Sequence, residues 1–155
     1  MENRKPLLIL FALAAAALLW RVETLQNLPI SLYVDEAQYW TWSRELQWGY
    51  FSKPPLVAFL IFCSTKIFGD GILGVKFLAM LCYPAAAFCL YFAARRLDFS
   101  VQESFFAALL ALFLPIFAWL GLVVSTDAPL CFLWSAAFYF FVRAQDENRA
   151  WDWLI

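Results

Sequence analysis

The sequence contains no histidine, and only 15% of its 155 residues are charged. The absence of histidine excludes His-based general acid–base catalysis and most transition-metal sites. No run of lysines and arginines is present and the net charge is −1, so nothing indicates a nucleic-acid partner. Soluble domains are roughly 45–50% apolar, whereas this sequence is 65% hydrophobic. The composition therefore predicts an integral membrane protein.

Cysteine is also scarce, and its four positions lack the spacing of a metal site. Cys63, Cys82, Cys89 and Cys131 all lie in apolar stretches. We expect them to be buried thiols inside membrane helices.

Long apolar runs predict helices that span the bilayer, each of which needs about 20 residues. The first span is expected at about 6–25, provided that Arg21 snorkels to the interface. A secretory signal peptide is the alternative, but WRVE after the run is a poor small-residue cleavage site. Further spans are expected over about 72–94, 104–124 and 128–144. We therefore predict an all-α fold of multiple transmembrane helices in one transmembrane domain.

The long segment 21–71 between the first two spans mixes aromatic and charged residues. It contains two stretches, 35–47 and 54–68, that are too short to cross a bilayer, and we expect them to form interfacial helices. Pro84 and Pro115 lie inside later spans, where proline usually marks a kink and not a break.

The basic residues indicate how these spans are oriented. They flank the spans on one side, at Arg4, Lys5, Arg95, Arg96, Arg143 and Arg149. The amino-terminus is therefore expected in the cytoplasm, with the protein in the cytoplasmic (inner) membrane. Loop 21–71 and the turn at 125–127 are then expected on the outer side, although Arg44 and Lys66 also lie in that loop.

Asp35 and Glu36 stand near the start of YVDEAQYWTWSREL, in which Asp35, Tyr39 and Trp42 recur at the spacing of one helix face. Asp35-x-x-Gln38 fits a capping box, so a helix cap is one interpretation of Asp35. The other interpretation is functional, since an acidic pair at the membrane surface would lie beside the polar head of a membrane-embedded substrate. A carboxylate there can act as a general base or bind a metal. Both interpretations stay open.

Two further polar residues are expected on the same surface. Lys53 precedes Pro54 and Pro55, which suit the start of a helix. A lysine beside a helix amino-terminus favours a phosphate group, and a lysine that snorkels at the interface is the alternative.

Asp127 follows Thr126, which can cap the last span and leave Asp127 in its first turn. Capping would also account for Asp127 fully.

The stretch YVDEAQYWTWSRELQWGYFSKPPLVAFLI, followed by STDAPLCFLWSAAFYFFVRA, resembles the bacterial family 39 glycosyltransferases. Relatives of that family are the lipid A aminoarabinose transferases and the protein O-mannosyltransferases. The resemblance implies the amino-terminal part of a C-type glycosyltransferase fold, with many membrane helices and a soluble carboxy-terminal domain. Family members run to several hundred residues, so the chain is expected to be incomplete and inactive alone. WDWLI at 151–155 is expected to start a further helix.

The resemblance also implies an activity, the transfer of a sugar from a polyprenyl-phosphate-linked donor to a lipid or protein acceptor on the outer face. A single displacement would invert the anomeric centre. Asp35 matches the family's catalytic acidic residue, Asp127 a second acidic residue, and Lys53 a lysine that contacts phosphate. A divalent metal at the Asp-Glu pair is left open. The candidate site is catalytic Asp35, Glu36 and Asp127 with substrate-binding Lys53, Tyr39 and Trp42.

Two other classes of function compete with this interpretation. A transporter subunit would place ionisable residues or unwound segments near the bilayer midplane. The middles of the later spans carry no charge, and the acidic residues lie at the outer ends. A purely structural membrane module would leave the alignment of Asp35, Lys53 and Asp127 as a coincidence.

Overall fold

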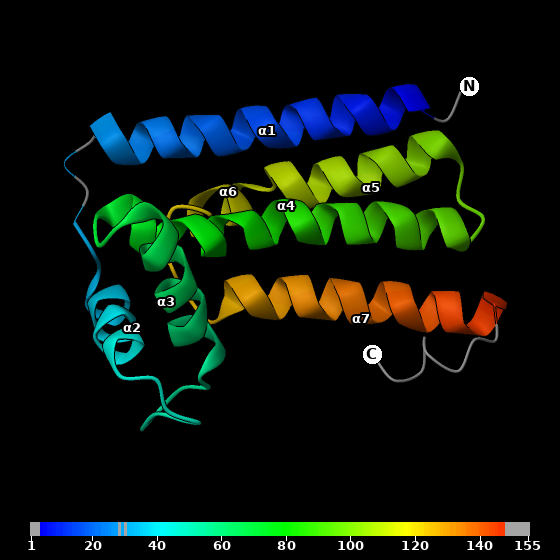
Figure 1. The fold of residues 1–155 in the computed structure, drawn as a ribbon. Helices are drawn as coiled ribbons and strands as arrows, with labels where there is room; N and C mark the ends of the chain where they lie inside the picture. Colours follow the sequence, from blue (N-terminus) through cyan, green and yellow to red (C-terminus); the bar gives the residue numbers. More distant parts are fainter. Residues whose placement is uncertain (1–3, 28, 30, 148–155) are drawn as a thin grey trace.

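A computed structural model describes residues 4–27, 29 and 31–147, and the expected helix start at 151–155 lies outside this part of the chain. Within the described residues the structure is all-α, as expected, with seven helices and no strand (Figure 1). The helices are α1 (Arg4–Asn27), α2 (Val34–Arg44), α3 (Leu56–Phe68), α4 (Ile72–Arg96), α5 (Val101–Phe113), α6 (Pro115–Leu120) and α7 (Asp127–Glu147).

Four of the helices, α1, α4, α5 and α7, run alongside one another, while α2, α3 and α6 gather at one end (Figure 1). Helix α4 is central, because it packs against α1, α3, α5 and α7. This arrangement brings α2, α3 and the connection between α6 and α7 to the same end of the bundle.

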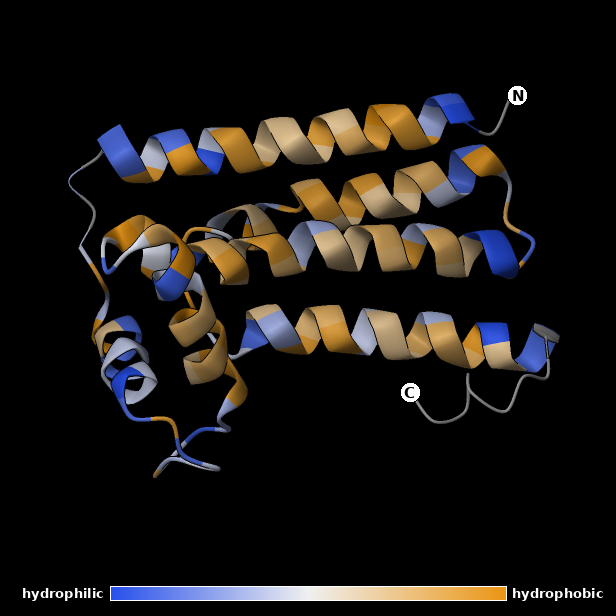
Figure 2. Cartoon of the chain, in the orientation of Figure 1, coloured by the Kyte–Doolittle hydropathy of each residue, from blue (hydrophilic) through white to orange (hydrophobic). Residues whose placement is uncertain are grey.

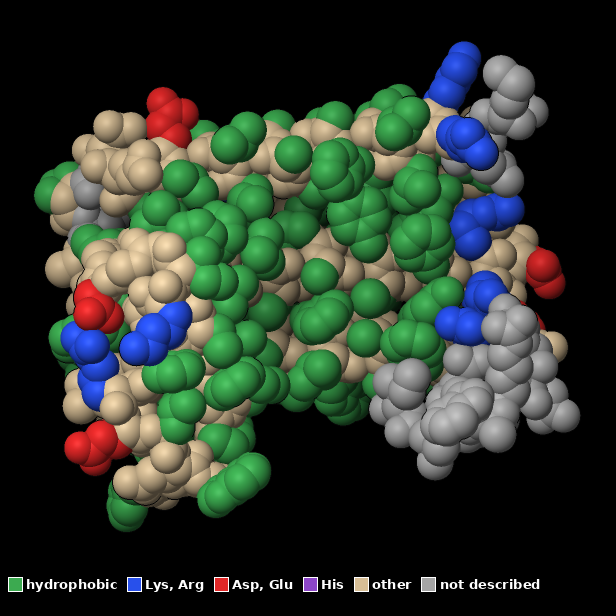
Figure 3. All heavy atoms as spheres, viewed as in Figure 1, with side chains coloured by type: hydrophobic (Ala, Val, Ile, Leu, Met, Phe, Trp, Pro, Cys, Tyr) green, Lys and Arg blue, Asp and Glu red, His purple; other side chains and the backbone are tan. Residues whose placement is uncertain are grey.

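The surface of the bundle is apolar in the middle and charged at its two ends (Figures 2 and 3). Helices α1 and α4 are long and apolar enough to cross a membrane. In α1 the side chains of Leu8, Phe11 and Leu19 are 67%, 65% and 68% exposed. Large apolar side chains exposed along a whole helix need an apolar solvent or a partner. The chain is therefore a helical membrane protein.

The structure differs from expectation at Pro115. Residues 104–124 do not form one kinked helix but are divided between α5 and the short α6. Leu114 has an extended backbone (φ −53°, ψ 131°), the conformation that a following proline imposes. By contrast, Pro84 lies within the continuous α4.

Helix α2 is also shorter than the expected 35–47. It ends at Arg44 because the hydroxyl of Tyr50 donates a hydrogen bond to the Trp42 carbonyl (2.9 Å) and accepts one from the Gln47 N–H (3.2 Å). These bonds satisfy backbone groups at the helix end that would otherwise need a further turn.

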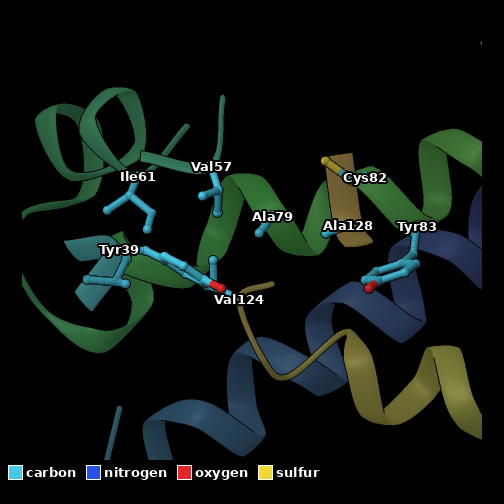
Figure 4. Close-up of a cluster of buried hydrophobic side chains, with 9 residues drawn as sticks. Tyr39, Val57, Ile61, Ala79, Cys82, Tyr83, Val124 and Ala128 are labelled. Carbon is cyan, nitrogen blue, oxygen red and sulfur yellow. The ribbon is translucent and has the colours of Figure 1, made fainter. Parts of the chain in front are cut away.

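Two hydrophobic clusters hold the bundle together. One cluster lies between α1, α4 and α5, around Leu10, Ala87 and Leu112. The other joins α2, α3, α4 and α7 at the end of the bundle, and Figure 4 shows Tyr39, Val57, Ile61, Ala79 and Val124 among its side chains. Val124 lies in the connection between α6 and α7, so this second cluster packs the connection against α2 and α3.

We predict that Gly74→Ala destabilises the junction of α3 and α4. A Cβ atom at Gly74 would lie 1.7 Å from the carbonyl oxygen of Gly69, which is backbone and cannot swing aside. Overpacking of this kind costs about 1–3 kcal/mol, and thermal unfolding in detergent would measure it. Gly49→Ala is the control, because its Cβ would meet nothing within 4 Å. Equal stability of the two variants would contradict this packing.

Candidate functional site

The polar residues of the candidate site belong to elements at one end of the bundle. Asp35 is in the first turn of α2, Lys53 lies just before α3, and Asp127 is the first residue of α7. Asp35 and Asp127 are exposed and Lys53 is half-buried. The three residues lie at the same end of the bundle because the chain passes through that end twice, once before α4 and once between α6 and α7 (Figure 1).

Asp35 is not the cap of its helix, so the capping interpretation is wrong for this residue. Tyr33 occupies the N-cap position, and the Tyr33 N–H donates to Glu36 Oε2 at 2.9 Å. Glu36 therefore supplies the acidic half of the capping arrangement. The exposed Asp35 carboxylate has no hydrogen bond or ion pair among the described residues.

Glu36 does not share the exposed position of Asp35, since its side chain is fully buried. Glu36 Oε1 lies 2.9 Å from Lys76 Nζ and accepts a 2.5 Å hydrogen bond from the Val124 N–H. Lys76 is also fully buried, and its ammonium donates to the Leu122 carbonyl at 2.8 Å. No motif in the sequence relates Glu36 to Lys76, although a lysine inside an apolar span is a signal that it needs a partner.

The Asp35–Glu36 pair does not fit a divalent cation. Both oxygens of Glu36 already accept bonds from the protein, so the pair offers only the carboxylate of Asp35. A calcium or magnesium site needs several oxygen ligands. Among the described residues, no group of three or more Asp, Glu, Cys and His side chains could hold a metal.

Lys53 lies in the segment that leads into α3. Its carbonyl accepts a hydrogen bond from the Tyr50 N–H at 3.3 Å. The helix begins after Pro55 without a side-chain cap, so the Leu56 N–H is left to bind an anion, whereas the next two residues, Val57 and Ala58, are buried. No ion pair occupies Lys53 in the described part of the chain. Its cationic side chain can therefore reinforce the positive end of α3.

The two aromatic candidates differ in exposure. Tyr39 is 2% exposed and belongs to the hydrophobic cluster at the end of the bundle, where its ring lies 5.7 Å from that of Trp42. Trp42 is half-buried and stacks on Tyr50, with ring centroids 4.6 Å apart and planes within 8°. Trp42 and Tyr50 line an open hollow of about 450 Å³ together with polar residues such as Glu45. Trp42 can contact a ligand in this hollow, whereas Tyr39 packs behind it.

Asp127 lies in the first turn of α7 as the sequence indicated, but the hydroxyl that binds its N–H is that of Ser125 and not that of Thr126. Its N–H donates to the Ser125 hydroxyl at 3.2 Å, and the Thr126 carbonyl accepts from the Leu130 N–H at 3.3 Å. The carboxylate is exposed in the first turn, where the helix dipole stabilises negative charge.

Arg21 does not snorkel as expected, because its side chain is only 2% exposed. Its guanidinium donates to the Phe117 carbonyl at 3.1 Å. Gly121 provides the space, since a Cβ there would lie 2.4 Å from the Arg21 guanidinium carbon. Arg21 therefore binds α1 to α6, just before the segment that leads to Asp127.

Comparison with known proteins agrees with the resemblance seen in the sequence. The model of the family described as dolichyl-phosphate-mannose-protein mannosyltransferase matches residues 52–155, which include Lys53, Lys76 and Asp127. Lipid A galacturonosyltransferase RgtD of Rhizobium johnstonii is 40% identical over 97 residues. That alignment covers 62% of this chain but only 20% of the relative. No solved structure matches the chain significantly.

Proposed function

Since the chain belongs to the dolichyl-phosphate-mannose-protein mannosyltransferase family, we propose that it is part of a membrane glycosyltransferase with a lipid or protein acceptor. The observation that carries the proposal is that Asp35, Lys53 and Asp127 belong to elements at one end of the bundle, next to an apolar surface. The chain spans a fifth of the length of its galacturonosyltransferase relative. Transfer is therefore expected from the complete protein, and these residues alone are expected to be inactive.

The donor in this proposal is a sugar linked to a polyprenyl phosphate. Its lipid tail suits the apolar surface of the bundle, and its phosphate suits Lys53 at the amino-terminus of α3. Lysine binds phosphate as a point charge. The phosphate leaves as a stable anion, so its departure needs little protonation.

Asp35 would act on the acceptor hydroxyl as a general base. The acceptor oxygen forms a bond to the anomeric carbon, and the bond from that carbon to the phosphate oxygen breaks. The phosphate leaves with the bonding electron pair, and the acceptor proton passes to the Asp35 carboxylate. A single displacement of this kind inverts the anomeric centre. Asp127 would orient the acceptor, and the half-buried Trp42 would contact the substrate, with Tyr39 packed behind it.

The outer face of the cytoplasmic membrane is the proposed side of the reaction. The support is the distribution of basic residues, since Arg4, Lys5, Arg95 and Arg96 lie at the end of the bundle opposite to α2 and α3. Basic residues are retained on the cytoplasmic side. The amino-terminus is then cytoplasmic, and the segment that carries Asp35 and Lys53 faces outward.

We predict that positions 47 and 102 are labelled from opposite sides of the membrane. Gln47 and Gln102 are both exposed and lie at opposite ends of the bundle. In a cysteine-free background, Gln47→Cys should react with an impermeant maleimide in intact cells, and Gln102→Cys only after permeabilisation. Labelling of both variants from one side would contradict this topology.

Asp35→Asn should reduce turnover by roughly 10²–10⁴-fold in the complete protein, because the amide cannot accept the acceptor's proton. Folding should be unaffected, since Asp35 is exposed and does not cap α2. Sugar transfer and thermal unfolding in detergent measure the two effects.

Asp98→Asn is the matched control for Asp35→Asn, as Asp98 is an exposed carboxylate at the other end of the bundle. It should transfer sugar at the wild-type rate. If Asp35→Asn does the same, Asp35 is not the base.

Lys53→Ala should weaken use of the lipid-linked donor, seen as a higher KM for that donor, because the phosphate loses its cation. Lys53→Arg should retain more activity, since the charge remains. Lys66→Ala is the control, because Lys66 is an exposed lysine at the other end of α3. If Lys53→Ala has an unchanged donor KM and turnover, Lys53 only lies at the membrane interface.

A further inference from the structure

Buried charged side chains hold α6 and the segment that connects α6 to α7. Three charged side chains from three helices reach this backbone: Arg21 of α1 at the Phe117 carbonyl, Lys76 of α4 at the Leu122 carbonyl, and Glu36 of α2 at the Val124 N–H. Each of these side chains is no more than 2% exposed. Charged side chains this deeply buried are costly unless they are paired and hydrogen-bonded. All three nevertheless bind the backbone of the same eight residues, 117–124.

Glu36 occupies the position that links the two acidic residues of the proposed site. It follows Asp35 directly in α2, and its carboxylate binds Val124, three residues before Asp127. The other oxygen of the same carboxylate accepts from the Tyr33 N–H, at the start of α2. One carboxylate therefore joins the beginning of α2 to the beginning of α7.

Lys76 completes the link from the central helix. Its ammonium contacts Glu36 at 2.9 Å and the Leu122 carbonyl at 2.8 Å, so it binds both α2 and the connection to α7. Lys76 lies one turn into α4, which packs against α3 and α7. The pair is therefore fixed to the central helix of the bundle.

We propose that Glu36 is a positioning residue, which with Lys76 as its counter-ion sets the location of Asp127 relative to Asp35 for the transfer reaction. This inference rests on the proposed function of that site. Glu36 then does not exchange a proton with the substrate, because both its oxygens are engaged and its side chain is fully buried. Catalytic groups displaced by about 1 Å can lose roughly 10²-fold in rate, so a link of this kind has a direct effect on turnover.

The test exchanges the buried ion pair for a neutral pair of similar shape. Glu36→Gln can still accept from the Val124 N–H but loses its charge, which leaves Lys76 without a counter-ion. Lys76→Met removes that orphaned charge at similar volume. A buried ion pair can often be replaced by neutral groups, whereas removal of one partner is strongly disruptive.

In the complete protein, Glu36→Gln should lower kcat by roughly 10- to 100-fold with little change in the KM for the donor, because Lys53 is not among the buried charged side chains. The Glu36→Gln/Lys76→Met double variant should recover most of the loss. Rescue distinguishes positioning from catalysis, since removal of Lys76 cannot replace a missing catalytic carboxylate. A double variant that does not fold, or that is as slow as Glu36→Gln, overturns the proposal.

A distance measurement tests the link between α2 and α7 independently of sugar transfer. Spin labels at Gln38→Cys and Leu130→Cys, both exposed on α2 and α7, report the separation of the two helices by pulsed electron paramagnetic resonance. Glu36→Gln should broaden or shift the distance distribution, and the double variant should restore it. An unchanged distribution in folded Glu36→Gln protein contradicts the proposal.

Asp70→Asn is the matched control for both measurements. It breaks the other ion pair of α2, Arg44–Asp70 at 3.1 Å, whose side chains are about half exposed. Exposed pairs contribute little, so the distances and kcat should remain those of the wild type. If no sugar transfer is found with any lipid-linked donor but Glu36→Gln alters the distances, the proposed function fails while the link between α2 and α7 stands.

Discussion

The buried ion pair between Glu36 and Lys76 is the interaction on which the arrangement of the site end depends. An apolar environment makes two isolated charges cost several kcal/mol each, about as much as a small domain's whole stability. Here each charge has hydrogen bonds besides its partner, to the backbone of Tyr33, Val124 and Leu122. Because removal of either partner would leave the other charge buried, the pair forces α2, α4 and the α6–α7 connection into a single relative arrangement.

The Glu36–Lys76 pair is related to the division of residues 104–124 between α5 and α6 at Pro115. An uninterrupted helix through 104–124 would satisfy its own backbone groups and leave fewer free carbonyls for buried side chains to bind. Beyond the end of α6 the Leu122 carbonyl is free to accept from Lys76, while the Phe117 carbonyl accepts from both the Gly121 N–H and Arg21. Irregular backbone at membrane depth is tolerated where buried protein groups satisfy it. Lys76 therefore satisfies a carbonyl that the end of α6 leaves free.

The apolar surface and the polar end have separate roles in the same molecule. Along α1 the large side chains face outward and suit lipid, while α4 buries half of its apolar stretch and organises the bundle. Polar side chains then occur where the bundle ends, with the exposed Asp35 and Asp127 at the surface and Glu36 beneath them. That layering keeps the polar side chains at the end of the bundle, away from the apolar surface that suits lipid.

Sequence alone determined the helical membrane class, the family, the half-length helices near α2 and α3, and the location of Asp127 in the first turn of α7. Each of these follows from hydropathy, helical spacing or a motif within one segment of the chain. Tertiary structure alone decided that Glu36 is buried while Asp35 is exposed and that Arg21 turns inward. Glu36 and Val124 are 88 residues apart, and Arg21 and Phe117 are 96 apart. No spacing rule relates such residues, because their contact depends on how separate helices pack.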